Sequence, residues 1–305
     1  MNLLPMHPAR FRRVLATNAR NPDVDWHDIY RHFVLWDFPA ETRGGFQVAF
    51  YRPQAVPRMA AVLAGTGHIK ANPGRRTLDT GIVILEVIEG GFDSPRGRKM
   101  VRLLTALHDR PDILQEDLTY VLCALIVVPT RFVDRMGWRP VLEVERVATW
   151  RFWSELGTRI GVEGLPTSYL DAEDRFDRYE AANLATSPDG LALTQMIVSA
   201  FAGWMPKPLS PHLAEITSSL IDDPLFSDAL GLPRPRRRTT AALNALYRAR
   251  RIRQRLSPPA KTPGFVPGQT VGDVYPNGYQ IDDIGPRAAH WIRSVVSARF
   301  RGTCN

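Results

Sequence analysis

Hydrophobic residues recur along most of the chain at the spacing of an α-helix, and the alternating stretches typical of strands are scarce. Runs of about 10 to 20 residues with this spacing are separated by proline and glycine, which commonly bound helices. The pattern predicts helices over residues 7–19, 26–36, 45–51, 56–66, 75–89, 95–110, 115–136, 140–160, 168–185, 190–202, 211–221, 224–230 and 239–256. The predicted fold class is therefore all-α.

Capping residues support these helices. Asp93 and Ser94 are suitable N-cap residues, and Pro95 suits the first helical position that follows them. Gly90 and Gly91 close the helix before that point, since glycine readily adopts the conformation that ends a helix.

The amino-acid composition of the chain changes after Leu256. The stretch SPPAKTPGFVPGQTVGDVYPNG is rich in proline and glycine, which favours an extended arm over a packed domain. A last short helix over residues 286–300 is expected to dock on the body. We predict a single globular helical domain over residues 1–256 and a C-terminal arm over residues 257–305.

Composition indicates an ordinary globular protein, with 305 residues, 44% of them hydrophobic and 23% charged. The most apolar segment, 118–128, is shorter than the roughly 20 residues that a membrane-spanning helix needs. The first residues lack the apolar stretch of a signal peptide. Two cysteines, Cys123 and Cys304, exclude a disulfide scaffold. We therefore expect a soluble cytoplasmic protein that does not insert into membranes.

The net charge of +8 is concentrated near the C-terminus, in RPRRR (234–238) and RARRIRQR (248–255). One hypothesis is a helical nucleic-acid-binding or regulatory protein that uses these arginines. The favoured interpretation of these arginines is a helix face that is exposed to solvent. Nucleic acid is therefore not the expected partner.

Several catalytic motifs are absent, among them GxSxG and HExxH. The glycine-bearing stretch GTGHIKANPGRR (65–76) has neither the preceding strand nor the spacing of a phosphate-binding loop, and it is interpreted as a helix-to-helix loop. His27, Asp28 and His32 could form a metal site, but capping and surface roles are favoured for them.

A histidine lies on the apolar side of the helix over residues 95–110. At 100° per residue His108 falls between Val101 and Leu104. A histidine in this position is most often a core residue bonded to a carbonyl group. The alternative is an iron ligand, because neutral imidazole binds buried iron and an apolar wall excludes water. The apolar arc of the helix consists of Met100, Val101, Leu103, Leu104 and Leu107.

The helix over residues 75–89 carries Arg76, Thr80, Val83 and Val87 in one line. One interpretation is that Arg76 lies at the helix mouth and Thr80 bonds to its carbonyl group. The other is that a guanidinium and a hydroxyl point into an interior cavity, lined further along by Val83, Ile84 and Val87. On this helix alone the first interpretation is favoured.

The two helices together resemble a known family. RRTLDT (75–80) is followed by LLTALHDR (103–110), as in MpaB-type oxygenases and latex clearing proteins. DILQEDLTYVLCALIVVPTRFVDRMGWRP (112–140) and EVERVATWRFWSELGTRIGVEGLPTSY (143–169) are also similar to segments of that family. The likeness runs from about residue 37 to residue 256, and the order and spacing of the motifs are more specific than any one of them.

The resemblance implies an all-helical domain that encloses one haem b, with iron bound by His108. Arg76 and Thr80 fall on an arginine and a threonine of the haem pocket in latex clearing proteins. The implied function is a haem-dependent oxygenase that acts with dioxygen on an apolar substrate, such as an alkene, isoprenoid or natural product. An electron donor is a further possible partner.

One position departs from the latex clearing branch. That branch has a lysine before the threonine, on the distal side of the haem, where this chain has Asp79. The difference favours the MpaB-type side of the family, whose named member is membrane-bound and cleaves a double bond in an isoprenoid side chain. Asp79 joins Arg76 and Thr80 as a candidate catalytic residue. Non-oxygenase biosynthetic chemistry on the same haem fold stays open, because pocket shape rather than fold sets the reaction.

Overall fold

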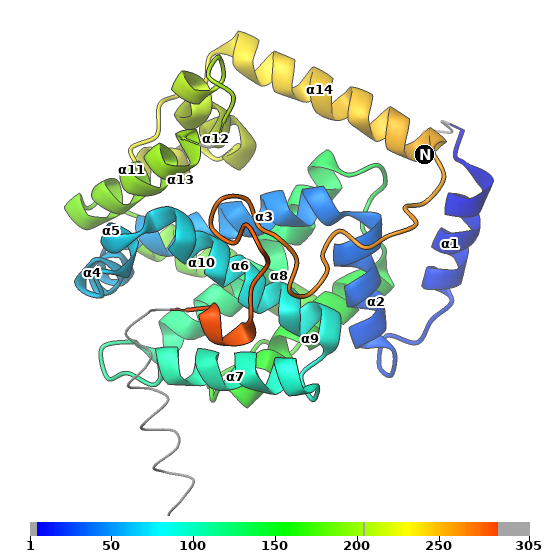
Figure 1. Ribbon diagram of the computed structural model, residues 1–305, viewed down its shortest axis with the longest axis horizontal. Coiled ribbons are helices and arrows are strands. Elements are labelled where there is room, and N and C mark those ends of the chain that lie inside the picture. The colour runs from blue at the N-terminus through cyan, green and yellow to red at the C-terminus, as the bar shows by residue number, and fades with distance from the viewer. Residues whose placement is uncertain (1–4, 204, 286–305) are drawn as a thin grey trace, which may run out of the picture.

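The computed structural model describes residues 5–203 and 205–285 (Figure 1). Within these residues the chain is helical, and the only β pairing consists of two isolated bridges between residues 271 and 278, so the all-α prediction is confirmed. The α-helices are α1 (Pro8–Asn18), α2 (Trp26–His32), α3 (Pro39–Tyr51), α4 (Pro57–Gly65), α5 (His68–Ala71), α6 (Pro73–Gly90), α7 (Pro95–His108), α8 (Gln115–Met136), α9 (Glu143–Arg159), α10 (Tyr169–Asn183), α11 (Pro188–Ala202), α12 (Leu213–Ile221), α13 (Pro224–Ala229) and α14 (Arg237–Leu256).

Four shorter elements complete the described part. They are the π-helical turn η1 (Phe33–Asp37) and the 3-10 turns η2 (Arg52–Ala55), η3 (Ser210–His212) and η4 (Ile281–Asp283).

The largest departures from the predicted helices lie in the first third of the chain. The helix predicted over 26–36 keeps α geometry only to His32 and continues as η1. α3 begins at Pro39, well before the predicted start at residue 45, because proline suits the first helical position. α5 was not predicted. The helix expected over 286–300 lies outside the described residues.

α8 is the central helix of the body. It packs against α3, α9 and α10, and every residue from 122 to 130 in its middle is buried. α3 comes so close that a Cβ atom on Gly45 would lie 2.4 Å from the Cα of Pro129. Glycine at this position therefore permits the contact between the two helices. No helix in the described ranges 5–203 and 205–285 has the length and apolarity needed to cross a bilayer.

A buried ionic cluster holds the end of α8. The guanidinium of Arg139 donates to Glu145 at 2.6 Å and to Asp37 at 2.9 Å. The indole of Trp138 donates to the Asp37 carbonyl at 3.1 Å. All three charged side chains are almost fully buried. These bonds fix η1 against the start of α9.

Residues 257–285, which we call the strap, return along the body and cross the outer side of α6 (Figure 1, orange to red). Tyr275 donates to Asp79 at 2.6 Å, and Tyr279 donates to Glu86 at 2.5 Å. The Gly264 amide donates to the Leu35 carbonyl at 2.6 Å. Residues 257–285 are thus irregular apart from η4 and pack on the helical body.

Candidate active site

An interior cavity of about 430 Å³ lies between α6, α7 and the helices that face them. Its size is within the range of small-molecule and cofactor sites. Most of its wall is apolar, which keeps the dielectric low around any polar group inside. The apolar wall includes Met59, Leu63, Ile84, Leu104, Leu107, Val121, Leu125 and Trp153.

The structure brings three of the four predicted site residues to this cavity. Arg76 and Thr80 lie one turn apart on α6, and His108 is the last residue of α7. Because α6 and α7 pack against each other, residues far apart in the sequence share one wall.

The ring of His108 has a defined orientation. Its Nδ1 lies 2.8 Å from the Leu104 carbonyl oxygen, which can only accept, so Nδ1 carries the proton. Nε2 then holds the lone pair, and it has no hydrogen-bond partner within the described residues. Burial lowers the pKa of His108, and the charge of Arg76 lowers it further, while the bond to Leu104 opposes the shift. His108 is therefore a neutral imidazole, both bonded to a carbonyl and exposed to the cavity.

Arg76 and Thr80 are joined by two hydrogen bonds. The Thr80 hydroxyl donates to the Arg76 carbonyl at 2.9 Å and accepts a hydrogen bond from the Arg76 guanidinium. Burial lowers the pKa of Arg76. No carboxylate forms an ion pair with Arg76 in the part of the chain that the structure describes. A cation without a counter-ion in an apolar wall favours the binding of an anionic group.

The apolar continuation of this line differs from the prediction. Ile84, one turn after Thr80, lines the cavity. Val83 and Val87 are buried but belong to the hydrophobic core rather than to the cavity wall.

Asp79 does not reach the cavity. Its carboxylate accepts from the Tyr275 hydroxyl and from the Gly285 amide at 3.1 Å, and Arg75 lies 3.7 Å away. Since α6 turns by 100° per residue, Asp79 is rotated away from the line of Arg76 and Thr80 and faces the strap. Asp79 is thus not among the residues that line the cavity, and the catalytic role predicted for it stays a prediction.

His68, which was not among the predicted site residues, also lines the cavity. The stretch 65–76 was predicted to be a loop, but it contains α5, whose first residue, His68, lines the cavity. Burial lowers the pKa of His68, and the charges of Arg76 and Arg110 lower it further. Gly67, with φ of +68°, turns the chain into α5. One feature of the sequence could have indicated a role for His68: it directly follows Gly67, in the segment that also carries Arg76.

The histidines of α2 have other partners. His27 Nε2 lies 3.0 Å from the Ile88 carbonyl, and His32 Nδ1 lies 3.1 Å from the Asp28 carbonyl. No group of three or more His, Cys, Asp or Glu residues suited to a metal occurs among the described residues. Cys123 is buried, and burial raises its pKa to about 12, so the thiol is protonated at neutral pH.

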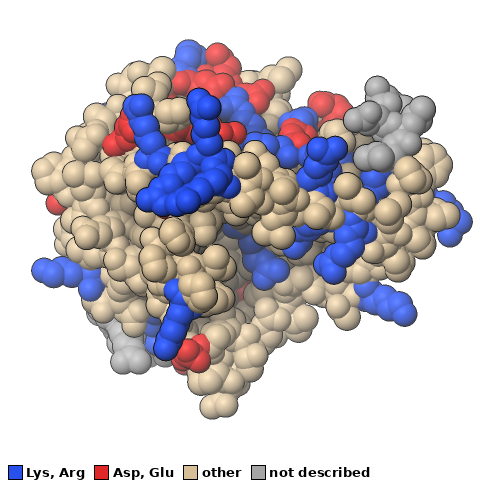
Figure 2. Space-filling view, turned by 90° about the horizontal axis from the view of Figure 1, so that it is seen from above, with Lys and Arg blue, Asp and Glu red and all other residues tan. Residues whose placement is uncertain are grey.

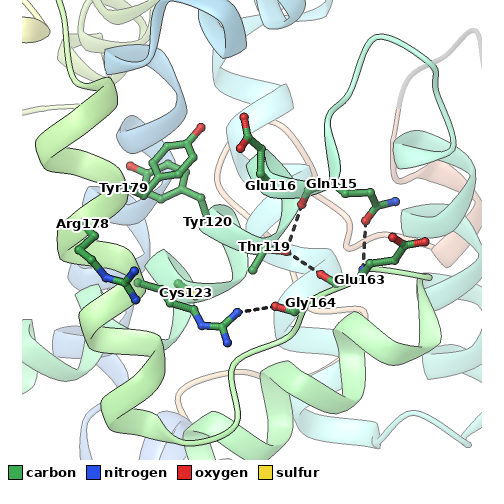
Figure 3. Close-up of a pocket in the computed structure, with 10 residues that line it drawn as sticks. Gln115, Glu116, Thr119, Tyr120, Cys123, Glu163, Gly164, Arg178 and Tyr179 are labelled. Atoms are coloured by element: carbon green, nitrogen blue, oxygen red, sulfur yellow. Dashed lines mark hydrogen bonds between the residues drawn. The ribbon is translucent and has the colours of Figure 1, made fainter.

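A second hollow, of about 640 Å³, lies on the surface beside α8 and α10 (Figure 3). Its polar groups bond to one another. Thr119 donates to the Glu163 carbonyl at 2.8 Å, and the Glu163 amide donates to Gln115 at 3.1 Å. Arg175 donates to the Gly164 carbonyl at 2.7 Å. The hollow is more open to solvent than the interior cavity, and its hydrogen bonds attach the loop around residue 164 to α8.

Residues 36–252 match the family described as "ER-bound oxygenase mpaB/B'/Rubber oxygenase, catalytic domain". The chain belongs to this oxygenase family. The match spans all of α6 and α7 and therefore contains Arg76, Thr80 and His108. The family's members are named as oxygenases, so the protein is an enzyme of the oxygenase type.

Individual relatives of the mpaB/rubber oxygenase family agree with this assignment. The chain is 25% identical to the ER-bound oxygenase mpaB' of Penicillium brevicompactum, over 88% of this chain and 79% of the relative. It is also 25% identical to the ER-bound oxygenase mpaB of Penicillium roqueforti (strain FM164), over 68% and 76%. A structure of the latex clearing protein LCP in the closed state shares the fold, with a TM-score of 0.54, 17% identity, and coverage of 86% and 77%.

Proposed function

We propose that the interior cavity holds haem b, that His108 Nε2 would bind the iron, and that the protein oxidises an apolar alkene or isoprenoid substrate with dioxygen. One observation carries this proposal. Because His108 Nδ1 donates to the Leu104 carbonyl, Nε2 is unprotonated and presents its lone pair, which can bind a metal ion, to an apolar cavity. When bound, the haem would supply the activation of dioxygen.

The residues of the chain would orient the cofactor and exclude water. The Leu104 carbonyl fixes the tautomer and the plane of the His108 ring. The surrounding apolar side chains, Leu104 and Leu107 among them, shield the site from solvent and suit an apolar substrate.

Arg76 would bind an anionic group in this site, such as a haem propionate, since it has no carboxylate partner of its own in the described residues. Thr80 fixes the guanidinium through its hydroxyl. His68 adds a second imidazole to the wall, and its neutral form can accept a proton during turnover.

Asp79 is assigned as a positioning residue. It anchors α6, the helix that carries Arg76 and Thr80, to the strap through Tyr275. Residues 1–256 would then form the haem-binding body, and the arm from residue 257 would stabilise one wall of the cavity. Dioxygen, an apolar substrate and an electron donor are the proposed partners, and the cytoplasm is the proposed compartment.

The proposal is tested by absorbance of the haem-reconstituted protein. We expect a Soret band for the wild type and a weakened or shifted band for His108→Ala. His108→Gly should regain the band when imidazole is added, because free imidazole can occupy the vacated position. His212→Ala, which alters an exposed histidine far along the chain, is the matched control and should keep the wild-type spectrum. An unchanged spectrum in His108→Ala would reject His108 as the ligand.

Isotopically labelled dioxygen separates the two chemistries that this site supports. For an oxygenase, we expect the label in the product of an isoprenoid-bearing substrate panel. Haem binding with full conversion of a substrate and no label incorporated would instead indicate non-oxygenase chemistry in the same pocket.

A further inference from the structure

α14 turns polar side chains toward the body of the protein. The Arg250 guanidinium donates to Glu41 at 3.0 Å, and Glu41 is completely buried. Arg251 donates to the carbonyl groups of Gly137 at 2.6 Å and Arg135 at 2.9 Å. No residue of α14 is fully buried, and its attachment combines these arginine hydrogen bonds with the contact of Tyr247 against Phe132 and the hydrophobic core.

The opposite face of α14 is apolar and exposed. Ile252 is 40% exposed and Leu256 is 51% exposed. At 100° per residue these two side chains lie on one line with a row of alanines. The alanines of this line are Ala242, Ala245 and Ala249.

Arginines flank this apolar line on both sides. Arg248 lies to one side of Ile252 and Arg253 to the other, about 40° and 100° around the helix. Both are exposed, and neither has an ion-pair or hydrogen-bond partner among the described residues. Figure 2, which looks onto the α14 side of the molecule, shows Lys and Arg spread over this face, with Asp and Glu mostly towards its edges.

An amphipathic helix usually turns its apolar side toward the core. α14 does so only through Tyr247 and carries a further apolar line on its exposed side. The apolar line of α14 is directed away from the body, and its flanking charges are unpaired. A helix with an apolar line between two rows of arginine is suited to lie in the plane of a bilayer surface.

We propose that α14 docks on the surface of a membrane that contains anionic phospholipid. Ile252 and Leu256 enter the boundary between headgroups and acyl chains. Arg248 and Arg253 bind the lipid phosphates on either side. The exposed arginines at residues 236–238 extend the positive charge to the other end of the helix.

A second helix adds apolar surface near Leu256. α1 is attached to the end of α14, since the His7 amide donates to the Arg255 carbonyl at 2.9 Å and Arg10 donates to the Ser257 carbonyl at 2.9 Å. On α1, Phe11 is 53% exposed and Leu15 is 54% exposed.

Other partners fit this face less well. A nucleic acid would bind the arginines but would leave Ile252 and Leu256 against a polar phosphate backbone. A second copy of the chain, packed through the same face, would place Arg248 and Arg253 opposite the identical arginines of its partner. Anionic lipid satisfies both the charge and the apolar line.

Vesicle flotation with the full-length protein tests the proposal. We expect the wild type to float with phosphatidylcholine vesicles containing phosphatidylserine and to stay unbound with phosphatidylcholine alone. Arg248→Gln with Arg253→Gln should reduce the bound fraction by about tenfold, since each cation near the surface contributes to binding. Ile252→Ser with Leu256→Ser should reduce it by a similar factor, because the inserted apolar area is lost.

The matched control replaces two exposed cations elsewhere, Arg102→Gln with Lys261→Gln, and should bind as the wild type does. Equal loss in this control would mean that net charge alone drives binding, and would overturn the proposal. Loss in the arginine variant with none in the Ile252 and Leu256 variant, together with competition by duplex DNA, would identify a nucleic-acid face instead. A dimer in solution that dissociates in the Ile252 and Leu256 variant would identify a second copy as the occupant.

A fluorescent probe provides an independent readout of insertion. Cysteine introduced at position 252 of a Cys304→Ser protein can be labelled with an environment-sensitive dye, because Cys123 is buried. A blue shift on addition of phosphatidylserine vesicles is expected. The same dye at position 244, closer to the polar edge of α14, should shift much less; equal shifts would contradict docking through the apolar line.

Discussion

At the scale of single residues, His108 shows what one sequence can and cannot reveal. The helical period placed this side chain among leucines, and the structure confirms that it faces the interior. The tautomer could not be predicted, because it depends on the bond to Leu104 within a particular rotamer. The position of His68 in the wall of the cavity could not be predicted either, since it depends on how α5 turns back toward α6.

The lowered pKa of His108 predicts a pH dependence for the cofactor-free protein. Between the ordinary value of 6.5 and the lower value in the folded state, the unfolded chain binds the proton more readily than the folded one. Stability should therefore fall as the pH drops below about 6.5. His108→Leu should lose this contribution, so its melting temperature should change less than that of the wild type between about pH 7.5 and pH 5.5. Parallel curves for the two proteins would refute the assignment of His108 as a buried neutral imidazole.

Removal of Arg139 should strongly destabilise the fold. In Arg139→Met the buried carboxylate of Glu145 loses its ion-pair partner, and that of Asp37 keeps only Arg13, at 3.3 Å. Loss of one partner of a buried ion pair typically costs about 3–5 kcal/mol. Urea unfolding measures the loss. The control, Arg178→Met, removes an exposed ion pair with Asp174 and should change stability by less than about 1 kcal/mol.

At the scale of elements, period and capping predicted most helices, and the bounds of α8 agree at both ends. The start of α3 was wrong because the first turns, PAETRGG, lack the apolar spacing on which the prediction relied. α3 is helical there because Pro39 initiates it and because the two glycines allow it to pack closely on α8. Such a contact depends on two helices at once and leaves little local signal.

Two glycines on helices should respond in opposite ways to alanine. Gly45→Ala should destabilise the protein by more than about 2 kcal/mol, because the new methyl group would overlap Pro129 and the helices would have to separate. Gly81→Ala meets no atom within 4 Å and should stabilise α6 by about 0.5–1 kcal/mol. Thermal unfolding of both variants tests the pair, and destabilisation of similar size in both would rule out the packing explanation.

At the scale of the whole molecule, the position of the strap could not be predicted. Composition indicated an extended arm, but the bonds from Tyr275 to Asp79 and from Tyr279 to Glu86 join residues nearly 200 positions apart. A tyrosine in an irregular segment carries no sign of which carboxylate it will reach.

Loss of these two bonds should loosen the strap. Tyr275→Phe with Tyr279→Phe leaves Asp79 and Glu86 buried without their hydroxyl donors, at a cost of about 1–3 kcal/mol for each bond. Hydrogen exchange should then become faster in residues 257–285 and in α6, and the strap should be cut sooner by protease. Exchange that accelerates in the strap alone would show that it does not support the cavity wall.

The long separation between the strap and α6 also affects how the protein is made. α6 leaves the ribosome long before Tyr275 and Tyr279 exist, so during synthesis its outer face is open to water. At that stage Asp79 and Glu86 are hydrated carboxylates, and their charge disfavours aggregation of this face with other nascent chains. These carboxylates are covered only after Tyr275 and Tyr279 have emerged, so the wall that carries Arg76 and Thr80 is completed long after α6 itself has been synthesised.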